Sequence, residues 1–242
     1  MIGKVNKFET RQALAQALAD RLVDWACHCK PPGRLELSGG STPKELLANL
    51  GARALPVALD VLPVDDRCVP LAHEYSNAGL LQAALGGDHN QPVPNQPFRG
   101  QSFRGQSFRV QPLYHESKGV GGSVEALKQA LSCEGNRPRF CVLGLGTDGH
   151  TASLFPGSAD LPTGLDACAP IFISAQPTRA PMVPRITMTA PYILGADQLA
   201  LHFHGPDKWA LFERAKTSPA ALHPIAHFLR HPHKSLDVYY AP

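Results

Sequence analysis

The sequence predicts an α/β fold in which a mostly parallel sheet is covered by helices on both faces. Short apolar runs alternate with segments of helical periodicity along most of the 242 residues. Glycine or polar clusters separate each apolar run from the helical segment that follows it. We expect a single domain over residues 1–242, with an inserted loop at about 87–116.

The first helix is expected from about Thr10 to Cys27. Its large apolar residues recur at spacings of four, four and three, so they lie on one face that packs on a sheet; they are Leu14, Leu18, Leu22 and Trp25. Pro31-Pro32-Gly33 ends this helix. Similar patterns predict further helices near residues 76–85, 123–131 and 207–215.

The strands are expected at short apolar runs, which cover residues 34–38, 59–64, 140–145, 171–174 and 199–203. In a parallel sheet, ligands bind beyond the carboxyl ends of the strands. The turns that join strands to helices are therefore the places to look for chemistry.

The alternation fails between Gly86 and Glu116, where a pentapeptide is repeated in tandem over residues 96–110. A period of five is too short for a repeat fold. We expect a duplicated surface loop, because loops accept insertions at low cost. A second interpretation stays open, in which three arginines of the repeats form a flap that attracts anions; these are Arg99, Arg104 and Arg109.

Composition and charge exclude several classes of protein. The net charge of +3 comes from scattered basic residues, so no nucleic-acid partner is expected. Neither a signal peptide nor a membrane-spanning apolar run is present, and a cytoplasmic protein is expected. The six cysteines include no C-x-x-C pair, and we expect reduced, mostly buried thiols.

No metal site is expected, although two groups of residues resemble ligand sets. The Cys27-His28-Cys29 segment has no second ligand pair at a suitable spacing. Near the C-terminus, His223 and His227 stand four apart and His231 and His233 two apart, but prolines interrupt them and the H-E-x-x-H pattern is absent.

The segment LSGGSTPKELL, residues 37–47, joins a strand to a helix through paired glycines. We expect Thr42 as the N-cap, Pro43 as the first helical residue and Glu45 as the partner in a capping box. Free backbone N–H groups and the positive end of the helix dipole would then suit a phosphate. The alternative is a helix that is well capped and binds nothing.

The segment VLGLGTDGHTASLFPG, residues 142–157, carries an apolar strand into a glycine turn that bears Asp148 and His150. An imidazole is a suitable general base near neutral pH, and a neighbouring carboxylate can hold its tautomer. A single histidine in a turn is more often structural, so the whole segment has to carry the interpretation.

Five segments occur in order along the chain: LSGGSTPKELL, DDRCVPLAHEYSN, LGLGTDGHTASLFPG, PRITMTAPYILGA and HGPDKWALF. Over about residues 35–212 they resemble the 6-phosphogluconolactonase family, and the DGHTASLFPG run is highly specific. The resemblance implies a three-layer Rossmann-like fold, shared with glucosamine-6-phosphate deaminase and ribose-5-phosphate isomerase. It also implies hydrolysis of 6-phospho-D-glucono-1,5-lactone to 6-phosphogluconate in the oxidative pentose phosphate pathway, without metal or cofactor.

Carried over position by position, the resemblance makes His150 the base that activates water and Asp148 its partner. Arg67 would lie across the pocket and steer the anionic substrate. The substrate-binding residues it implies are Gly39, Gly40, Ser41, Thr42, Asn77, Arg185 and Lys208. The chain departs from the family's usual pattern at Asp66, where glutamate is usual, and at Thr147, where glutamate or proline is frequent.

The expected partner is a small phosphosugar lactone, and the expected state is a monomer or weak homodimer. Two other functions are alternatives to a lactonase. The glucosamine-6-phosphate deaminase family carries DGHIAFNEPG at this turn. This chain has Leu154-Phe155 in place of that Asn-Glu pair. An inactive sugar-phosphate sensor would usually carry a DNA-binding helix-turn-helix, for which 242 residues leave no room. A nucleophile elbow, G-x-S-x-G, is absent, so direct attack by water is favoured.

Overall fold

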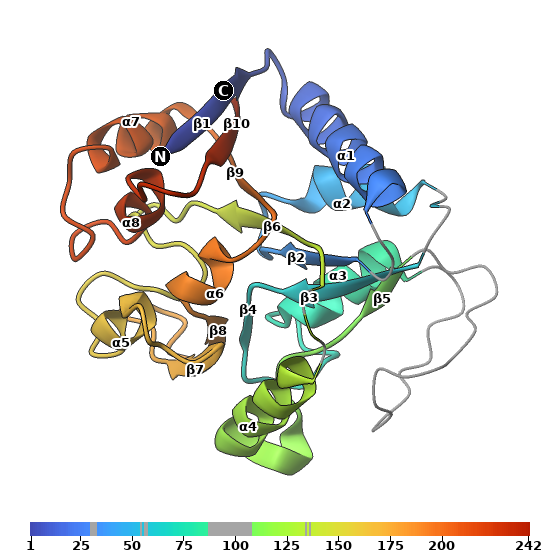
Figure 1. The fold of residues 1–242 in the computed structure, drawn as a ribbon, viewed down its shortest axis with the longest axis vertical. Coiled ribbons are helices and arrows are strands. Elements are labelled where there is room, and N and C mark those ends of the chain that lie inside the picture. The colour runs from blue at the N-terminus through green and yellow to red at the C-terminus, as the bar shows by residue number, and fades with distance from the viewer. Residues whose placement is uncertain (30–32, 54, 56–57, 87–107, 134, 136) are drawn as a thin grey trace.

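The computed structural model describes residues 1–242 except 30–32, 54, 56–57, 87–107, 134 and 136 (Figure 1). Its helices are α1 (Arg11–His28), α2 (Lys44–Gly51), α3 (Asn77–Leu85), α4 (Gly119–Ser132), α5 (Leu161–Leu165), α6 (Ala190–Leu194), α7 (Pro206–Ala215) and α8 (Ile225–Leu229), with a 3-10 turn at Glu116–Lys118. Its strands are β1 (Ile2–Lys7), β2 (Arg34–Leu37), β3 (Leu59–Pro63), β4 (Asp65–Arg67), β5 (Phe108–Val110), β6 (Arg139–Gly144), β7 (Phe172–Ala175), β8 (Arg185–Met188), β9 (Gln198–His204) and β10 (Leu236–Ala241).

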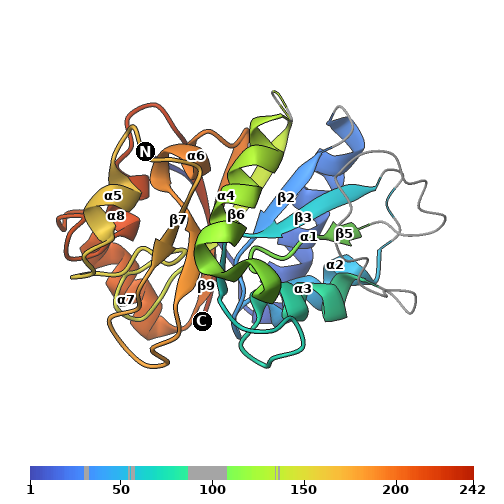
Figure 2. The same cartoon turned by 90° about the horizontal axis from the view of Figure 1, so that it is seen from below.

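The main sheet confirms the predicted α/β architecture. Its seven strands run in the order β1-β10-β9-β6-β2-β3-β5, and each neighbouring pair is parallel. The helices α1, α2 and α3 lie on one side of this sheet and α6, α7 and α8 on the other (Figures 1 and 2). The fold therefore has three layers.

Alternate side chains of the central strands pack into two separate apolar cores, one on each face of the main sheet. In β6, Phe140 and Val142 point into the core beneath α1 and α2, whereas Cys141 and Leu143 point into the core beneath α7 and α8. Burial on both faces is the reason why these strands are continuous apolar runs. The C-terminal ends of β2, β6 and β9 are thereby held at one rim of the sheet.

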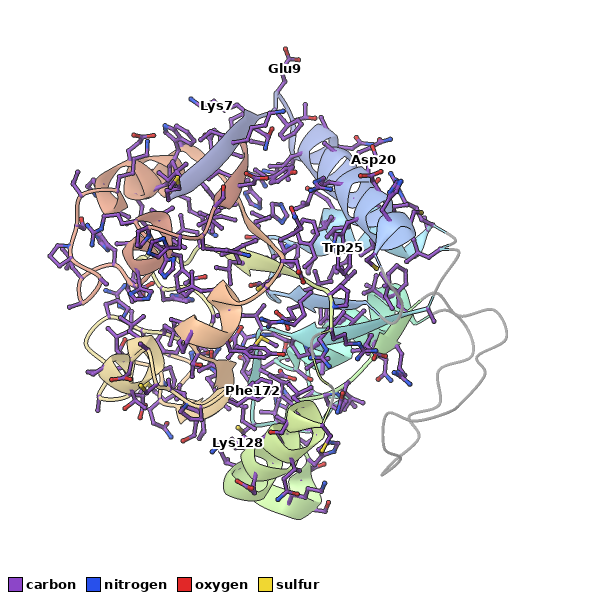
Figure 3. The ribbon with its side chains drawn as sticks, viewed as in Figure 1. Lys7, Glu9, Asp20, Trp25, Lys128 and Phe172 are labelled. Carbon is purple, nitrogen blue, oxygen red and sulfur yellow. The ribbon has the colours of Figure 1, made fainter. Side chains whose placement is uncertain are left out.

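The first helix was predicted within one residue at each end. Thr10 is its N-cap, and the Thr10 side chain accepts a hydrogen bond from the Ala13 backbone N–H. Figure 3 shows Trp25 pointing from α1 toward the sheet and Asp20 pointing away from it. The Trp25 ring meets Phe140 of β6 edge to face, with 5.7 Å between ring centroids.

A second, smaller sheet differs from what the sequence predicted. The expected strand at 171–174 does form, as β7, but it belongs to an antiparallel sheet in the order β4-β8-β7. An apolar run shows that a strand forms, but it does not show which sheet takes it up. This small sheet brings β4 and β8 to the rim where the main strands end.

Two neighbouring strands at one side of the main sheet also escaped prediction. Ile2–Lys7 and Leu236–Ala241 form β1 and β10, which pair with each other in parallel. The short strand β5 lies inside the segment predicted as a loop at about 87–116, and it pairs with β3.

Most of the pentapeptide repeat, including Arg99 and Arg104, lies outside the described residues. Arg109 forms an ion pair with Asp60 of β3, so it is a structural residue of the sheet edge rather than part of an anion-attracting flap.

Two further findings concern the cysteines and the helices. The six cysteines are free thiols, but only Cys141 is buried, which corrects the expectation that most would be. Within the described residues, no helix is both long enough and apolar enough to cross a membrane.

Candidate active site

A cleft of about 200 Å³ opens where the strands of the two sheets end. It is bordered by the turns after β2 and β6, by the end of β4, by the start of β8 and by the first turn of α7. Nine of the ten candidate residues line this cleft: Gly39, Gly40, Ser41, Thr42, Arg67, Asn77, His150, Arg185 and Lys208. The tenth, Asp148, lies against His150.

The turn after β6 places the His150 ring directly over its own backbone. A Cβ atom on Gly146 would stand 2.1 Å from His150 Nδ1, so only glycine leaves room for the ring. Gly149 has a φ of +87°, a left-handed conformation that favours glycine. These two glycines of the GTDGH segment therefore fix the path of the turn and the position of the imidazole.

Asp148 holds the His150 ring from within the turn. Its Oδ1 accepts a hydrogen bond from the His150 backbone N–H at 3.0 Å and lies 2.5 Å from Nδ1. Burial alone would raise the pKa of Asp148, but its hydrogen bonds with His150 and the charge of that ring outweigh burial and lower the pKa to about 2. An ionised carboxylate here accepts the proton on Nδ1, which leaves the Nε2 lone pair free to act as a base.

Phe155 forms an apolar wall next to this pair. Its ring centroid lies 4.9 Å from that of His150, and the Arg185 guanidinium carbon lies 5.6 Å from the same ring. Phe155 and Arg185 are both buried. The wall therefore brings the half-exposed imidazole and a buried cation together at one end of the cleft.

Arg67 is held at the cleft by a short chain of hydrogen bonds. Its Nη1 donates to Asn77 Oδ1 at 2.5 Å and to the Tyr75 carbonyl oxygen at 3.2 Å. The Asn77 Nδ2 donates to the Asp65 carbonyl oxygen at 2.7 Å. A Cβ atom on Gly39 would stand 2.0 Å from Asn77 Oδ1, so this glycine makes room for the amide. Asn77 thus supports Arg67, although it also borders the cleft.

Asp66 anchors the start of α3 beneath Arg67. Its two carboxylate oxygens accept hydrogen bonds from the backbone N–H groups of Arg67, Asn77 and Ala78, at 2.7 to 3.1 Å. Burial raises the pKa of Asp66 to about 6, even though these three donors act in the opposite direction. An aspartate therefore fulfils a positioning role at this departure from the family's pattern.

Arg185 and Asp65 form a second buried pair at the same end of the cleft. Arg185 Nη1 lies 3.7 Å from Asp65 Oδ2, and the Ser153 hydroxyl donates to the same oxygen at 2.5 Å. In the small sheet, Arg185 is the register partner of Arg67. Burial lowers the pKa of Arg185, and nearby Asp65 opposes that shift. Two guanidinium groups therefore border the cleft from neighbouring strands.

The turn after β2 forms another wall of the cleft. Gly40 has a φ of +89°, and no atom lies within 4 Å of the position a Cβ would take, so the space above it is open. Lys208 of α7 donates from Nζ to Thr42 Oγ1 at 3.4 Å. Burial lowers the pKa of Lys208. A hydroxyl and an ammonium group thus face the same space beside an open glycine turn.

The predicted capping box is wrong. The helix α2 begins at Lys44, its N-cap is Pro43, and no side chain caps it. Residues 41–43 form turns that place Thr42 outside the cap position, so Glu45 is too close to the helix start to be its partner. The Thr42 hydroxyl faces Lys208 instead, which leaves it available to a ligand.

Two histidines of the site were not predicted. His223 Nδ1 lies 3.2 Å from the Asp148 carbonyl oxygen, and the His223 ring packs against Gly149. His202, in β9, borders the cleft and is buried. No local pattern marks either residue. His223 contacts the Asp148 turn from 75 positions away along the chain, and the sequence around His202 predicts only a strand.

The residues that resemble metal ligands are not gathered in space. Among the described residues, no three His, Cys, Asp or Glu side chains are placed to hold one ion. Near the C-terminus, the ring centroids of His227 and His231 are 6.4 Å apart and those of His231 and His233 are 6.1 Å apart.

The chain is similar to known proteins over nearly its whole length. A 6-phosphogluconolactonase from Mesorhizobium japonicum is 34% identical over 98% of this chain and 94% of its own length. The crystal structure of a 6-phosphogluconolactonase from Shewanella baltica superposes with a TM-score of 0.83 at 27% identity, covering 99% of this chain and 97% of that one. A monomeric glucosamine-6-phosphate deaminase has the same fold, with a TM-score of 0.76 at 15% identity, covering 99% and 97%.

The family model for glucosamine-6-phosphate isomerases and 6-phosphogluconolactonase matches residues 9–237. That span includes both ends of the cleft, the small sheet and the C-terminal segment that supports the Asp148 turn. The chain therefore belongs to the glucosamine-6-phosphate isomerase/6-phosphogluconolactonase family.

Proposed function

We propose that this protein hydrolyses 6-phospho-D-glucono-1,5-lactone to 6-phosphogluconate, with His150 as the general base. The observation that carries the proposal is the His150–Asp148 pair, which leaves Nε2 free at one end of a cleft whose other end suits a phosphate. Relatives named 6-phosphogluconolactonase that span the whole chain support it.

Hydrolysis proceeds by attack of water on the lactone carbonyl carbon, C1. Nε2 of His150 takes a proton from the water as the new C–O bond forms, and the Asp148 carboxylate stabilises the imidazolium that results. Arg67 and Arg185 offer positive charge to the oxyanion that develops on the carbonyl oxygen. When the tetrahedral intermediate collapses, the bond from C1 to the ring oxygen breaks and the imidazolium returns the proton to that oxygen.

The phosphate is held away from the reacting carbon. The backbone at Gly39, Gly40 and Ser41, the Thr42 hydroxyl and the Lys208 ammonium surround the open end of the cleft. Anchoring this end lowers the entropy that is lost when C1 is brought up to His150 and its water. A reactive lactone then needs little beyond one base and this positioning.

The residues after the catalytic turn argue against deamination of glucosamine 6-phosphate. Leu154 and Phe155 occupy the positions at which the deaminase pattern carries Asn and Glu. Both are buried, Leu154 in the apolar core and Phe155 against His150 and Arg185. A carboxylate that would assist ring opening is therefore missing from that part of the turn. An inactive sensor is disfavoured because the acid–base pair is intact and borders the cleft.

The proposal is tested by giving the purified protein freshly made 6-phospho-D-glucono-1,5-lactone and, separately, glucosamine 6-phosphate. We expect acid release above the uncatalysed rate with the lactone and no ammonia release with the amino sugar. A His150→Asn variant controls for contaminating activity and should be inactive. Ammonia release, or acid release that His150→Asn retains in full, would overturn the proposal.

The remaining parts of the proposal concern context. We place the reaction in the cytoplasm, in the oxidative pentose phosphate pathway, and propose that the protein acts as a monomer or weak homodimer without nucleic-acid partners. The relatives named 6-phosphogluconolactonase support the pathway. We also propose that residues 1–242 form a single domain with an inserted loop at about 87–116.

A further inference from the structure

His202 lies at the base of the cleft, near its phosphate end. It follows Leu201 in β9, and its register partner in β6 is Gly144, which also borders the cleft. Alternation along β9 turns His202 to the same side as Ala200, the side that also carries Val142 and α2. The ring therefore faces the space beneath Gly40, Ser41 and Thr42 and not the core beneath α7.

The imidazole of His202 has no hydrogen bond to any residue that the structure describes, although its residue is only 5% exposed. Among the described residues, the side-chain atoms that are fully buried without a partner do not include the His202 ring nitrogens, so these nitrogens are reached from the cleft. The rest of the ring is covered, and valine or leucine would fill such a strand position without the cost of covering a polar ring. An unpaired imidazole that borders a cleft instead points to a ligand as its partner.

The charges around His202 favour its neutral form. Burial lowers the pKa of His202 to about 3, and the nearby side chains of His204 and Lys208 lower it further. A neutral imidazole keeps one N–H donor at every pH at which the protein works. It adds a directed hydrogen bond beside Lys208 without placing a second buried cation there.

We propose that His202 donates a hydrogen bond to the phosphate group of the substrate and so contributes to selection of phosphorylated lactones. This inference rests on the proposed function, because it assigns one more contact to the same cleft. Lys208 supplies charge and Thr42 a hydroxyl, while His202 supplies a rigid donor from the sheet itself. A phosphomonoester would satisfy the otherwise unpaired ring.

The test compares His202→Phe, which keeps a planar ring without a donor, with His202→Gln, which keeps a donor. His204→Phe is the matched control, because it makes the same change two residues along β9 at a position that does not border the cleft. Each variant is measured for kcat and KM with the phosphorylated lactone and for competitive inhibition by inorganic phosphate.

We expect His202→Phe to raise KM and the inhibition constant of phosphate about tenfold, with kcat within about twofold of the wild type. His202→Gln should stay within about threefold of the wild type on both constants. The inference is overturned if both constants are unchanged in His202→Phe, or if kcat falls while phosphate inhibition is unaffected, since that pattern indicates a structural role.

A second measurement keeps the inference testable if His202→Phe fails to fold. In the wild-type protein labelled with ¹⁵N in its histidine rings, inorganic phosphate should shift the ring nitrogen signals that His202→Gln lacks. Signals that stay in place at saturating phosphate would refute the contact. If the wild type hydrolyses no lactone, the proposed function fails, but the phosphate titration still decides the role of His202.

Discussion

Replacement of Gly146 by alanine tests the placement of the catalytic imidazole with a change that touches no charged group. The added Cβ would stand 2.1 Å from His150 Nδ1 and 2.2 Å from Cε1, whereas real Cβ atoms are essentially never closer than 3.0 Å to another atom. The ring must therefore move by about 1 Å, and a displacement of that size costs on the order of a hundredfold in rate. Gly146 has no positive φ, so the backbone itself accepts alanine.

The expected result is a kcat about a hundredfold lower, with KM within a few fold, because the phosphate end of the cleft is untouched. Initial rates with the phosphorylated lactone measure both constants, and circular dichroism shows that the variant is folded. Gly121→Ala in α4 is the control, since no atom lies within 4 Å of its added Cβ, and we expect unchanged kinetics. A folded Gly146→Ala protein with kcat within threefold of the wild type would refute the assignment of His150.

Three further predictions concern the charged groups of the cleft. His150→Ala should lower kcat by about 10²- to 10⁴-fold and leave KM within a few fold, as measured by initial rates. Folding lowers the pKa of Asp148 from 3.8 to about 2, so as the pH falls the unfolded chain binds a proton at this carboxylate before the folded chain does. The ionised Asp148 therefore stabilises the folded state fully above about pH 4, and this stabilisation is lost toward pH 2. In urea unfolding, the free energy of unfolding of Asp148→Asn should be about 1 kcal/mol below that of the wild type at pH 6, and the two values should converge near pH 2. This difference is smaller than the pKa shift alone would give, because the His150 side chain is 33% exposed and solvent screens the pair. Lys208→Met should raise KM for the phosphorylated lactone and the inhibition constant of phosphate about tenfold at nearly constant kcat, and equal effects on an unphosphorylated lactone would contradict its place beside the phosphate.

Local periodicity predicted the elements that are buried on a regular pattern. The apolar residues of α1 and β6 repeat with the spacing of a helix and of a doubly covered strand, so both were located to within one or two residues. In contrast, β1 has no continuous apolar run, since three of its six residues are exposed at the sheet edge. Its pairing with β10 joins opposite ends of the chain, and no window of neighbouring residues contains that information.

The site shows the same division between local and distant information. Glycine turns after strands marked the segments that carry His150 and Thr42, because such turns lie at the ligand-binding edge of a parallel sheet. The resemblance then supplied Arg67, Arg185 and Lys208, whose side chains the structure gathers around one cleft. Spacing alone also suggested a capping box, which fails because a turn at residues 41–43 delays the helix start.

The support of the catalytic turn could not be found from the segment that forms it. The Ile225 backbone N–H donates to the Gly149 carbonyl oxygen at 3.0 Å, and His223 contacts the Asp148 carbonyl oxygen, so the segment before α8 holds the turn from behind. Neither contact has a sequence signature, since each depends on how α8 packs on the sheet.

In the proposed mechanism, the two sheets carry different tasks. The main parallel sheet provides the glycine turn and the Lys208 helix that would hold the phosphate. The small antiparallel sheet adds Arg67 and Arg185, which would act on the reacting carbon. Anchoring and chemistry are therefore carried by different parts of the chain, so a change at two positions of one turn can alter the reaction while the phosphate end stays the same. Leu154 and Phe155 lie at those positions here, so neither position offers the acid that ring opening of an amino sugar would need, while the His150–Asp148 pair that we propose as the base is intact.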